Sequence, residues 1–590
     1  MRLFDEQASR GILTTFIGLI LFIAIGFYAE QSNLFSNLKK VVRSQSVPSG
    51  ILSYGSLGRI VKQLGVVQAI PNDFSVFKPS VDNTALMNEG YIQNKRYVGD
   101  YLFQSKIGGA KDMPSSLAVR KEFFKDGWPL LSVVVDKDDL FSPERGIIAR
   151  YRKRGREWER LAYVSYYENG DLLFASGAGL RVHGFRGIRH RASITSFRLY
   201  FRNDYGASQF MPDILFDQKT RPLKQIVLYR DRPEHFFSSI LAFEVVNRIG
   251  AIRPEIKPVI FYRNGVLQGA YYLQERLYKE QWVSRLGHNN FAFIKYKGTS
   301  DREDLKLYEK LETWAKDFEG NMTMEETEKY VDIDNLSRHI ISIIFCGTSD
   351  WRQGAAVLDK QISRGKWFWI NWDMDQSFWD YYSRFWEEKK RDEWEQEGLE
   401  LLMSGKYFII PYSKVIPIDR RDIRAVLFIR LSKECPKYRK YFVRLVMDQL
   451  NHRINADFLN SRISHYMRLA FTYGLKNQAL IQSLIKRKRF FQKRAHFVRD
   501  QIQRYFGTGE SLFCEVKGPT GIEYKIDGYS EKDSYHGWYF KDERITIEIT
   551  GQHKSSFLYW LVNGKKIATP FLDYPVSLKT TIVPVLKESS

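Results

Sequence analysis

Two short stretches of the chain carry acidic residues where they could act on a phosphate group. Asp350 opens the segment Asp350-Trp-Arg-Gln-Gly-Ala-Ala, and Asp373 and Asp375 follow the apolar run Lys366 to Trp372. In phosphoryl transfer, one acid orients or deprotonates the acceptor hydroxyl and another holds Mg²⁺ on the phosphates. We therefore expect Asp350 and Asp373 to share one metal-phosphate site. The alternative is that these aspartates cap loops and form salt bridges with arginines.

The apolar pattern around these acids indicates the elements that position them. Lys366 to Trp372 is typical of a buried strand, and period-2 alternation then places Asp373 and Asp375 on one side of its carboxyl end. Asn335 to Phe345 repeats apolar residues at helical spacing and ends near a glycine. Asp350 is therefore expected on a loop just past a helix.

Further residues lie on predicted strands. Two β-rich runs flank Asn264-Gly265, a strong hairpin signal, so Glu275 should end the second strand, where it either pairs with a basic residue or faces solvent. Ser196 to Arg202 alternates apolar and basic residues, so Arg198 either clamps phosphate oxygens or is a solvated arginine. Trp367 has an even spacing from Asp373, which suits either a ring that stacks on adenine or a core tryptophan.

Four blocks of the sequence, in order, resemble the CotH (spore coat protein H) kinase family. They are Gly179 to Gly187 running into Ser196 to Arg202, the hairpin Val259 to Glu275, the Asp350 loop, and the Trp-Asp-Met-Asp strand end. The resemblance implies an atypical protein-kinase-like fold that transfers phosphate from ATP to protein Ser/Thr.

The resemblance also implies roles for individual residues. Asp350 would be the catalytic base, and Asp373 the principal ligand of Mg²⁺ or Mn²⁺. Glu275 and Arg198 would position the phosphates of the nucleotide. The remaining candidates are auxiliary metal ligands, Asp375 and Gln353, and nucleotide-contacting residues, Arg186 and Trp367.

The sequence departs from the family pattern at two places. The family usually has a lysine before the Ser-Tyr/Phe-Arg segment, where this chain has Ile194 and Thr195. The family also tends to follow its catalytic Asp with an Asn, where this chain has Gln353 and Ala355. These departures favour a rival reading, in which a catalytically degenerate kinase acts as a membrane-tethered scaffold or an adhesion or binding module.

Composition limits the classes of partner. The net charge of +22 favours anionic partners, but the chain has no finger spacing, aromatic RNA-binding signature or basic low-complexity tail, so we expect no nucleic-acid partner. The expected partners are a nucleotide and a protein acceptor in surface or envelope assembly. The three cysteines are widely spaced and predict unpaired thiols.

The N-terminus predicts a membrane anchor. Gly11 to Ala29 is almost wholly apolar and uncharged, long enough to span a bilayer as a helix, and no clear cleavage site follows it. We expect a single-pass protein of the cell membrane. Basic residues flank the segment on both sides, which leaves the side of the soluble part undetermined.

The expected fold class is α+β. We predict an atypical protein-kinase-like core with an N-terminal transmembrane helix, a flanking β region and a C-terminal β-sandwich-like module. The predicted parts are a tail (1–10), the anchor (11–29), a membrane-proximal region (30–126), a β lead-in region (127–175), the kinase core with a helical C-terminal lobe (176–507) and a small β domain (508–590). In the helical lobe, the basic run Lys486 to Arg489 either meets an acidic partner or is a solvated helix face.

Overall fold

A computed structural model describes most of the chain after residue 129. The described residues are 95–98, 101–104, 118–120, 129–168, 171–184, 196–206, 210, 223–231, 237–264, 266–295, 300–348, 353–359, 361, 365–378, 392–404, 422–472 and 478–587. Among them, no helix is long and apolar enough to cross a membrane. The predicted anchor, Gly11 to Ala29, lies outside the described residues.

The chain divides into two compact units. The first comprises Met1–Val76 and Arg96–Tyr101, and the second comprises Phe77–Lys95 and Leu102–Ser590. Three short strands lie in the first part of the chain: β1 (Lys95–Val98), β2 (Tyr101–Gln104) and β3 (Ala118–Arg120). All features described below belong to the second unit.

Seven strands of the second unit close into a barrel in the order β10-β8-β7-β6-β5-β4-β9. Neighbouring strands are antiparallel except β4 and β9, which are parallel. Their apolar side chains fill the interior, with Phe174 lying edge-on to Phe201 and Phe210. The barrel strands are β4 (Leu130–Val135), β5 (Arg160–Glu168), β6 (Asp171–His183), β7 (Ser196–Tyr200), β8 (Gln225–Tyr229), β9 (Ile256–Arg263) and β10 (Val266–Gln274), with the short helices α5 (Lys137–Phe141) and η2 (Arg156–Trp158) between β4 and β5.

Two predictions from the sequence can be compared with the structure of this barrel. The predicted hairpin is present, because β9 and β10 pair in antiparallel register and Asn264 adopts the left-handed conformation that its turn requires, with φ of 50°. The predicted boundary between residues 175 and 176 needs correction, since it falls inside β6 and β4 and β5 pair into the same barrel as β6. Cross-strand pairing, which a local pattern does not reveal, makes these strands one structure.

After the barrel comes a three-stranded antiparallel sheet of β11 (Phe291–Lys295), β12 (Gly354–Asp359) and β13 (Lys366–Asn371). Helix α11 (Ile333–Cys346) packs against β13 and presents apolar side chains such as Leu336 and Ile340 to the core. The Asp332 carboxylate caps its first turn by accepting from Asn335 N at 2.8 Å, and Gly347 ends it with φ of 58°. The predicted helix is therefore confirmed, and it begins two residues earlier and ends one residue later than expected.

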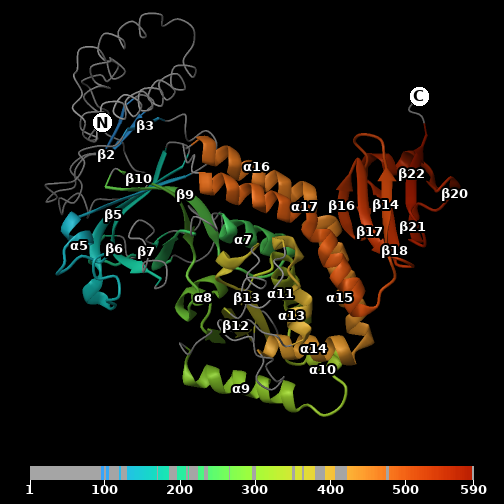
Figure 1. The fold of residues 1–590 in the computed structure, drawn as a ribbon, viewed down its shortest axis with the longest axis horizontal. Helices are drawn as coiled ribbons and strands as arrows, with labels where there is room; N and C mark the ends of the chain where they lie inside the picture. The colour runs from blue at the N-terminus through green and yellow to red at the C-terminus, as the bar shows by residue number, and fades with distance from the viewer. Residues whose placement is uncertain are drawn as a thin grey trace, which may run out of the picture. The chain divides into compact units, whose positions relative to one another are not determined.

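Other helices surround this sheet, and α16 and α17 run side by side (Figure 1). The helices are α7 (Ser238–Ile249), α8 (Lys279–Leu286), α9 (Arg302–Asp317), α10 (Met324–Thr327), η5 (Met374–Gln376), η6 (Glu393–Glu395), α13 (Gly398–Ser404), α14 (Ile423–Glu434), α15 (Pro436–Asp448), η8 (Gln449–Arg453), α16 (Ala456–Thr472) and α17 (Gln478–Phe506).

Two sheets at the C-terminal end share one hydrophobic core, which includes the fully buried Trp560. One sheet has the order β17-β14-β22-β19-β20 and the other the order β16-β15-β18-β21. We call this part the C-terminal β module. Its strands are β14 (Ser511–Lys517), β15 (Glu523–Ile526), β16 (Tyr529–Lys532), β17 (Ser534–Phe540), β18 (Arg544–Thr550), β19 (Phe557–Val562), β20 (Lys565–Ile567), β21 (Phe571–Pro575) and β22 (Thr580–Leu586), with η9 (Gly551–Ser556) before β19.

A buried polar contact around His452 joins the C-terminal β module to η8. The imidazole stacks between the rings of Tyr529 and Tyr535, at centroid distances of 4.6 and 5.0 Å. Its Nδ1 lies 2.7 Å from Glu531 Oε1, and its Nε2 lies 3.6 Å from Asp527 Oδ2. Burial lowers the pKa of His452, but hydrogen bonds to the two carboxylates outweigh burial and raise this pKa above 6.5.

We predict that this junction loses stability as the pH rises. A histidine with a raised folded-state pKa stabilises the protein fully below its unfolded pKa of about 6.5, and this contribution is lost as the pH rises through the folded-state value. His452→Gln should remove this dependence. The other charged groups facing the contact are Arg444, which pairs with Asp527 and Asp448, and Arg453, whose guanidinium lies over Tyr529.

Hydrogen exchange in β14 and β17, corrected for the intrinsic effect of pH and measured between about pH 6.5 and 9, tests this prediction. Burial raises the pKa of Asp448 to about 6, so its titration is completed near the acidic end of this window. Protection that declines with pH equally in the native protein and in His452→Gln would contradict the role assigned to His452.

Candidate functional site

Asp373 and Asp375 lie just beyond β13, where the chain leaves the sheet. The strand ends at Asn371, Asp373 has a left-handed backbone with φ of 55°, and Asp375 lies in the short helix η5. The expectation that strand alternation places both aspartates on one side is therefore wrong, because regular β geometry stops before Asp373. A turn, and not the strand, sets the directions of the two carboxylates. We call the segment from Asp373 to Asp375 the acidic turn.

Tyr229, the last residue of β8, connects this turn to the barrel. Its hydroxyl donates to Asp375 Oδ2 at 3.1 Å. Burial raises the pKa of Tyr229 well above 10, and the negative charges of Asp375 and Asp373 raise it further. Tyr229 therefore stays protonated and serves as a fixed hydrogen-bond donor to the acidic turn.

Three cations converge on the barrel side of the same region. Arg198 on β7 and Arg276 after β10 lie close enough to Lys295, at the end of β11, to lower its pKa, and Arg198 also lowers the pKa of Arg276. All three cations lower the pKa of His183. Burial is the larger cause in each case. We call Arg198, Arg276 and Lys295 the cation cluster.

The contacts of the cation cluster are mostly to neutral groups. Arg198 donates to the Tyr200 hydroxyl at 2.9 Å and lies 2.8 Å from His183 Nδ1, while Arg276 donates to Gln225 Oε1 at 2.6 Å. Burial strongly lowers the pKa of His183, so this imidazole is neutral and accepts the hydrogen bond from Arg198. The Nε of Arg198 is buried and has no hydrogen-bond partner among the described residues. Such a donor suits an anionic ligand.

Lys295 is the member of the cation cluster that lies near the acidic turn. Its Nζ donates to the Leu277 carbonyl at 3.1 Å and lies 5.6 Å from the centroid of the Trp372 ring. Burial, with Arg276 and Arg198, lowers the pKa of Lys295 to about 8, whereas the nearby Asp373 raises it. The charge of Lys295 therefore interacts with the two arginines and with Asp373.

Glu275 has a different partner from the one predicted. It follows β10 as expected, is buried, and pairs with Arg285 Nη1 at 3.3 Å while accepting from Glu255 N at 3.1 Å. Burial raises its pKa, and Arg285 opposes this. No contact between Glu275 and Arg198 occurs in the described residues, so the structure does not bring this predicted pair together.

Trp367 lies in the protein core. Its side chain is 3% exposed, and its ring meets Tyr308 of α9 edge-on at 5.1 Å. The Trp367 backbone bonds to Tyr330 and Asp332, on the strand edge away from β12. This placement matches the core tryptophan that the sequence left open as an alternative to adenine stacking.

The other predicted site residues lie at or outside the limits of the described chain. Gln353 immediately precedes β12, whereas Arg186 and Asp350 are not among the described residues. Ala355 pairs with Ile370 and Lys295 within the sheet, and its side chain is buried.

Within the described residues, no group of three or more His, Cys, Asp or Glu side chains could hold a metal ion. Mg²⁺ usually keeps several waters and takes one or two carboxylates together with substrate phosphates. Asp373 and Asp375 beside a cation cluster fit that mode of binding, whereas a dedicated all-protein metal site does not fit these residues.

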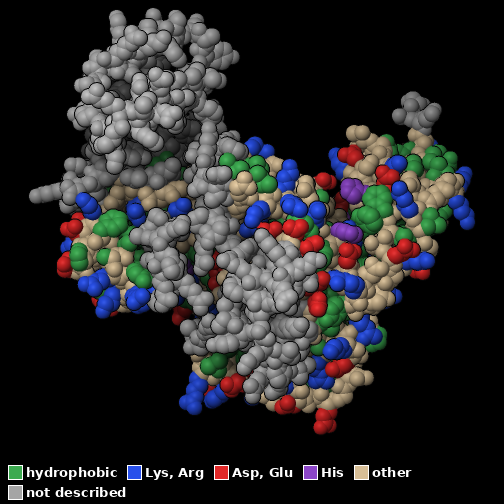
Figure 2. Space-filling model, viewed as in Figure 1, with side chains coloured by type: hydrophobic (Ala, Val, Ile, Leu, Met, Phe, Trp, Pro, Cys, Tyr) green, Lys and Arg blue, Asp and Glu red, His purple; other side chains and the backbone are tan. Residues whose placement is uncertain are grey.

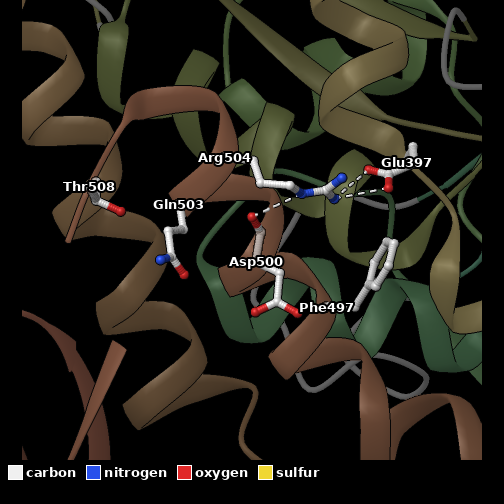
Figure 3. A pocket seen from close by; sticks show the side chains of 6 residues that line it. All are labelled: Glu397, Phe497, Asp500, Gln503, Arg504 and Thr508. Carbon is white, nitrogen blue, oxygen red and sulfur yellow. Dashed lines mark hydrogen bonds and ion pairs between the residues drawn. The ribbon is translucent and has the colours of Figure 1, made fainter. Parts of the chain in front are cut away.

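A separate hollow of about 650 Å³ lies at the C-terminal end of α17 (Figure 3). Arg504 crosses it and binds Glu397 through both carboxylate oxygens, at 2.9 and 3.0 Å. The hollow contains none of the predicted site residues. It is lined by Glu397, Phe497, Asp500, Gln503, Arg504 and Thr508.

Comparison with known protein families identifies the family to which the chain belongs. The family model described as CotH kinase protein matches residues 180–504, more than half of the chain. The protein therefore belongs to the CotH kinase family, and its mixed α and β structure contains a CotH domain. A search of curated proteins found no match to this chain. Family membership suggests a kinase-like activity.

Sequence reasoning missed Lys295, Arg276 and Tyr229. Arg276 directly follows Glu275, and Lys295 ends the apolar run Phe291 to Ile294, so both occupy the strand-end position at which the predicted acids were found. A search for basic residues at predicted strand ends would have found both.

Proposed function

We propose that this protein transfers phosphate from ATP to a protein Ser or Thr hydroxyl, with Mg²⁺ or Mn²⁺. The observation that carries the proposal is Lys295, a half-buried lysine whose charge interacts with those of Arg276, Arg198 and Asp373. Family membership supports the same class of reaction. A cation cluster facing an acidic turn provides the opposite charges that a nucleotide triphosphate with its metal ion requires.

In the proposed reaction, the acceptor hydroxyl oxygen forms a bond to the γ-phosphorus, and the bond from that phosphorus to the β,γ-bridging oxygen breaks, releasing ADP. Asp350 would orient the hydroxyl and take its proton. Asp373, with Asp375 and Gln353 as auxiliary ligands, would hold the metal ion, which when bound neutralises phosphate charge. Arg198, Arg276 and Lys295 would hold the phosphate oxygens.

The lysine absent before Ser196 bears on this proposal. Lys295 comes from another strand, so it offers a positive charge to the phosphates without occupying the usual position in the sequence. It could thus replace the lysine for which Ile194 and Thr195 stand. Ala355 favours the rival function, a degenerate kinase that serves as a membrane-tethered scaffold or binding module, because no asparagine supplies a second-metal ligand.

We further propose that the acceptor is a surface or envelope protein and that Gly11 to Ala29 anchors the enzyme in the cell membrane. The uncharged apolar composition of this segment supports the anchor. Extraction of the full-length protein from membranes tests this part: release by detergent but not by alkaline carbonate is expected, and release by carbonate alone would contradict it.

Thermal melting with ATP and Mg²⁺ tests nucleotide binding. A ligand that binds only the folded state at 100 times its Kd stabilises the protein by about 2.7 kcal/mol, so the native protein should melt at a higher temperature. Arg198→Gln should reduce this shift, because it removes a phosphate donor. An unchanged melting temperature of the native protein over a wide range of ATP concentrations would contradict nucleotide binding.

A further inference from the structure

One face of α17 carries a row of buried polar side chains at seven-residue spacing. Arg487, Arg494 and Gln501 are 2%, 0% and 1% exposed. Seven residues make about two helical turns, so the three side chains point to the same side of the helix. We call Arg487, Arg494 and Gln501 the α17 polar row. A solvated basic helix face would not bury its arginines in this way.

Arg494 ties the end of α11 to the segment that begins at η6. Its guanidinium donates to the carbonyls of Ile344 at 2.5 Å and Phe345 at 3.0 Å, in the last turn of α11. It also donates to the carbonyls of Trp394 and Gln396, at 2.5 and 2.8 Å. A cation at the C-terminal end of a helix is favoured by the helix dipole. Helix α11 ends four positions before Asp350 in the sequence.

Arg487 reaches the other acidic segment. Its Nη1 donates to the carbonyl of Phe378, three positions after Asp375, and its Nη2 donates to Ser238 Oγ at 3.2 Å. Phe378 in turn donates its backbone N–H to the Cys346 carbonyl at 2.8 Å. The chain beyond Asp375 and the end of α11 are therefore bonded to each other, and both are bonded to α17.

The third side chain and the next turn of α17 extend these contacts. Gln501 accepts from Leu399 N at 2.9 Å and donates to the Gln396 carbonyl at 3.3 Å. Beyond it, Arg504 holds Glu397 at the hollow shown in Figure 3. Three side chains of α17, from Arg494, Gln501 and Arg504, thus bind the segment from Trp394 to Leu399.

Burying the guanidinium groups of Arg487 and Arg494 costs free energy, which indicates that the two arginines have a role beyond packing. Burial lowers the pKa of Arg494 to about 9 and that of Arg487 to about 10. In the described residues, neither guanidinium hydrogen-bonds to a carboxylate, so each gives up its hydration for neutral acceptors. A buried apolar side chain would avoid this cost, but it could not fix the carbonyls of two separate segments in one geometry.

We propose that α17 is the positioning helix of the phosphate-transfer site. Arg487 fixes the chain just after Asp373 and Asp375, and Arg494 fixes the end of α11. Both are positioning residues, because among the described residues they donate to backbone carbonyls and to Ser238 and not to a candidate site residue. The inference rests on the proposed function and assigns the geometry of the site to a helix more than 100 positions further along the chain.

Kinetics of Arg494→Lys in the full-length protein tests the proposal. Lysine keeps the charge but lacks the fork that reaches four carbonyls. A misplacement of about 1 Å can cost about 100-fold in rate, so kcat should fall by roughly this factor while KM for ATP changes little. Arg487→Lys, which provides a second test if Arg494→Lys does not fold, should show the same division between kcat and KM.

Arg499→Lys is the matched control. Arg499 is also a buried arginine of α17, but its guanidinium lies over the Trp538 ring of the C-terminal β module at 4.9 Å. The kcat of the Arg499→Lys variant, per folded molecule, should match that of the native protein. A similar loss in all three variants, or no loss beyond the unfolded fraction in the first two, would overturn the positioning role. An inactive native protein would instead overturn the proposed function and this inference with it.

Discussion

Lys295→Met is expected to lower kcat/KM for ATP by about 10²- to 10³-fold, the usual effect of removing one preorganised group that stabilises charge in the transition state. Lys295 lies half-buried at the end of β11, near Arg198, Arg276 and Asp373. Methionine has a similar shape and no charge. Steady-state transfer of γ-phosphate to an added protein acceptor measures the effect.

The same residue predicts a pH dependence. Burial and the two arginines lower the pKa of Lys295 to about 8, and the ammonium form is the one that binds phosphate. In the free enzyme, kcat/KM should therefore be highest below this pKa and decline as the pH rises through it. Lys295→Arg should retain a charge at higher pH and move the decline upwards.

Lys257→Met is a suitable control. Lys257 is a partly buried lysine of β9 whose Nζ lies 3.0 Å from Glu168 Oε1, and it is not part of the cation cluster. Its replacement should leave transfer close to the native rate. If Lys295→Met retained native activity, or if both variants lost activity equally, the phosphate-binding role of Lys295 would be wrong.

Asp527→Asn should have the largest effect on stability. Asp527 is fully buried between the C-terminal β module and α15, where it lies 2.8 Å from Arg444 Nη2 and accepts from the Tyr539 hydroxyl at 2.6 Å. The substitution removes the ion pair with Arg444, but Arg444 is partly exposed and keeps its second partner, Asp448, so we expect the cost of losing hydrogen bonds to a buried charge, about 1.5 to 3 kcal/mol. The free energy of local opening in β14 to β18, measured by hydrogen exchange, should fall by this amount.

Asp573→Asn provides the comparison. Asp573 pairs with Arg544 at 2.6 Å in the same module, but both side chains are about half exposed. Exposed pairs contribute only about 0 to 1 kcal/mol, so this variant should remain close to native. Equal effects of the two substitutions would show that the junction does not depend on its buried charges.

Local patterns in the sequence predicted several elements well. Helix α11 and the β9–β10 hairpin carry strong signals, namely an apolar stripe with a capped start and an Asn-Gly turn. The strand β13 was predicted one residue too long, since Trp372 is apolar but lies after the last strand pairing. The anchor and Asp350 stay predictions because they fall outside the described residues.

Interactions between distant parts of the chain were less predictable. Glu275 was placed correctly at a strand end, but its partner Arg285 comes from a helix that no local pattern links to it. The run Lys486 to Arg489 was read as exposed or partner-binding, yet Arg487 is buried while Lys486 and Arg489 are largely exposed. Charge suggests exposure, whereas helical geometry turns one residue of the run inward.

The overall net charge also shows that properties of the sequence did not reveal interactions between distant residues. Figure 2 shows acidic side chains intermixed with basic ones over the described helical part, without a single large basic patch on that face. The net charge of +22 therefore gave little indication of a site. The cation cluster is small and partly buried, so its identification required the pairing of strands from the barrel and the three-stranded sheet.

Transfer of radiolabelled γ-phosphate by the full-length protein tests the proposed function most directly. The assay would include Mg²⁺ or Mn²⁺ and compare the native protein with Asp373→Asn and Asp350→Asn. We predict label on the protein itself or on an added acceptor, lost in both variants while their melting temperatures stay near native. No label from the native protein with either metal ion, or undiminished labelling in both variants, would contradict a kinase that uses these two aspartates.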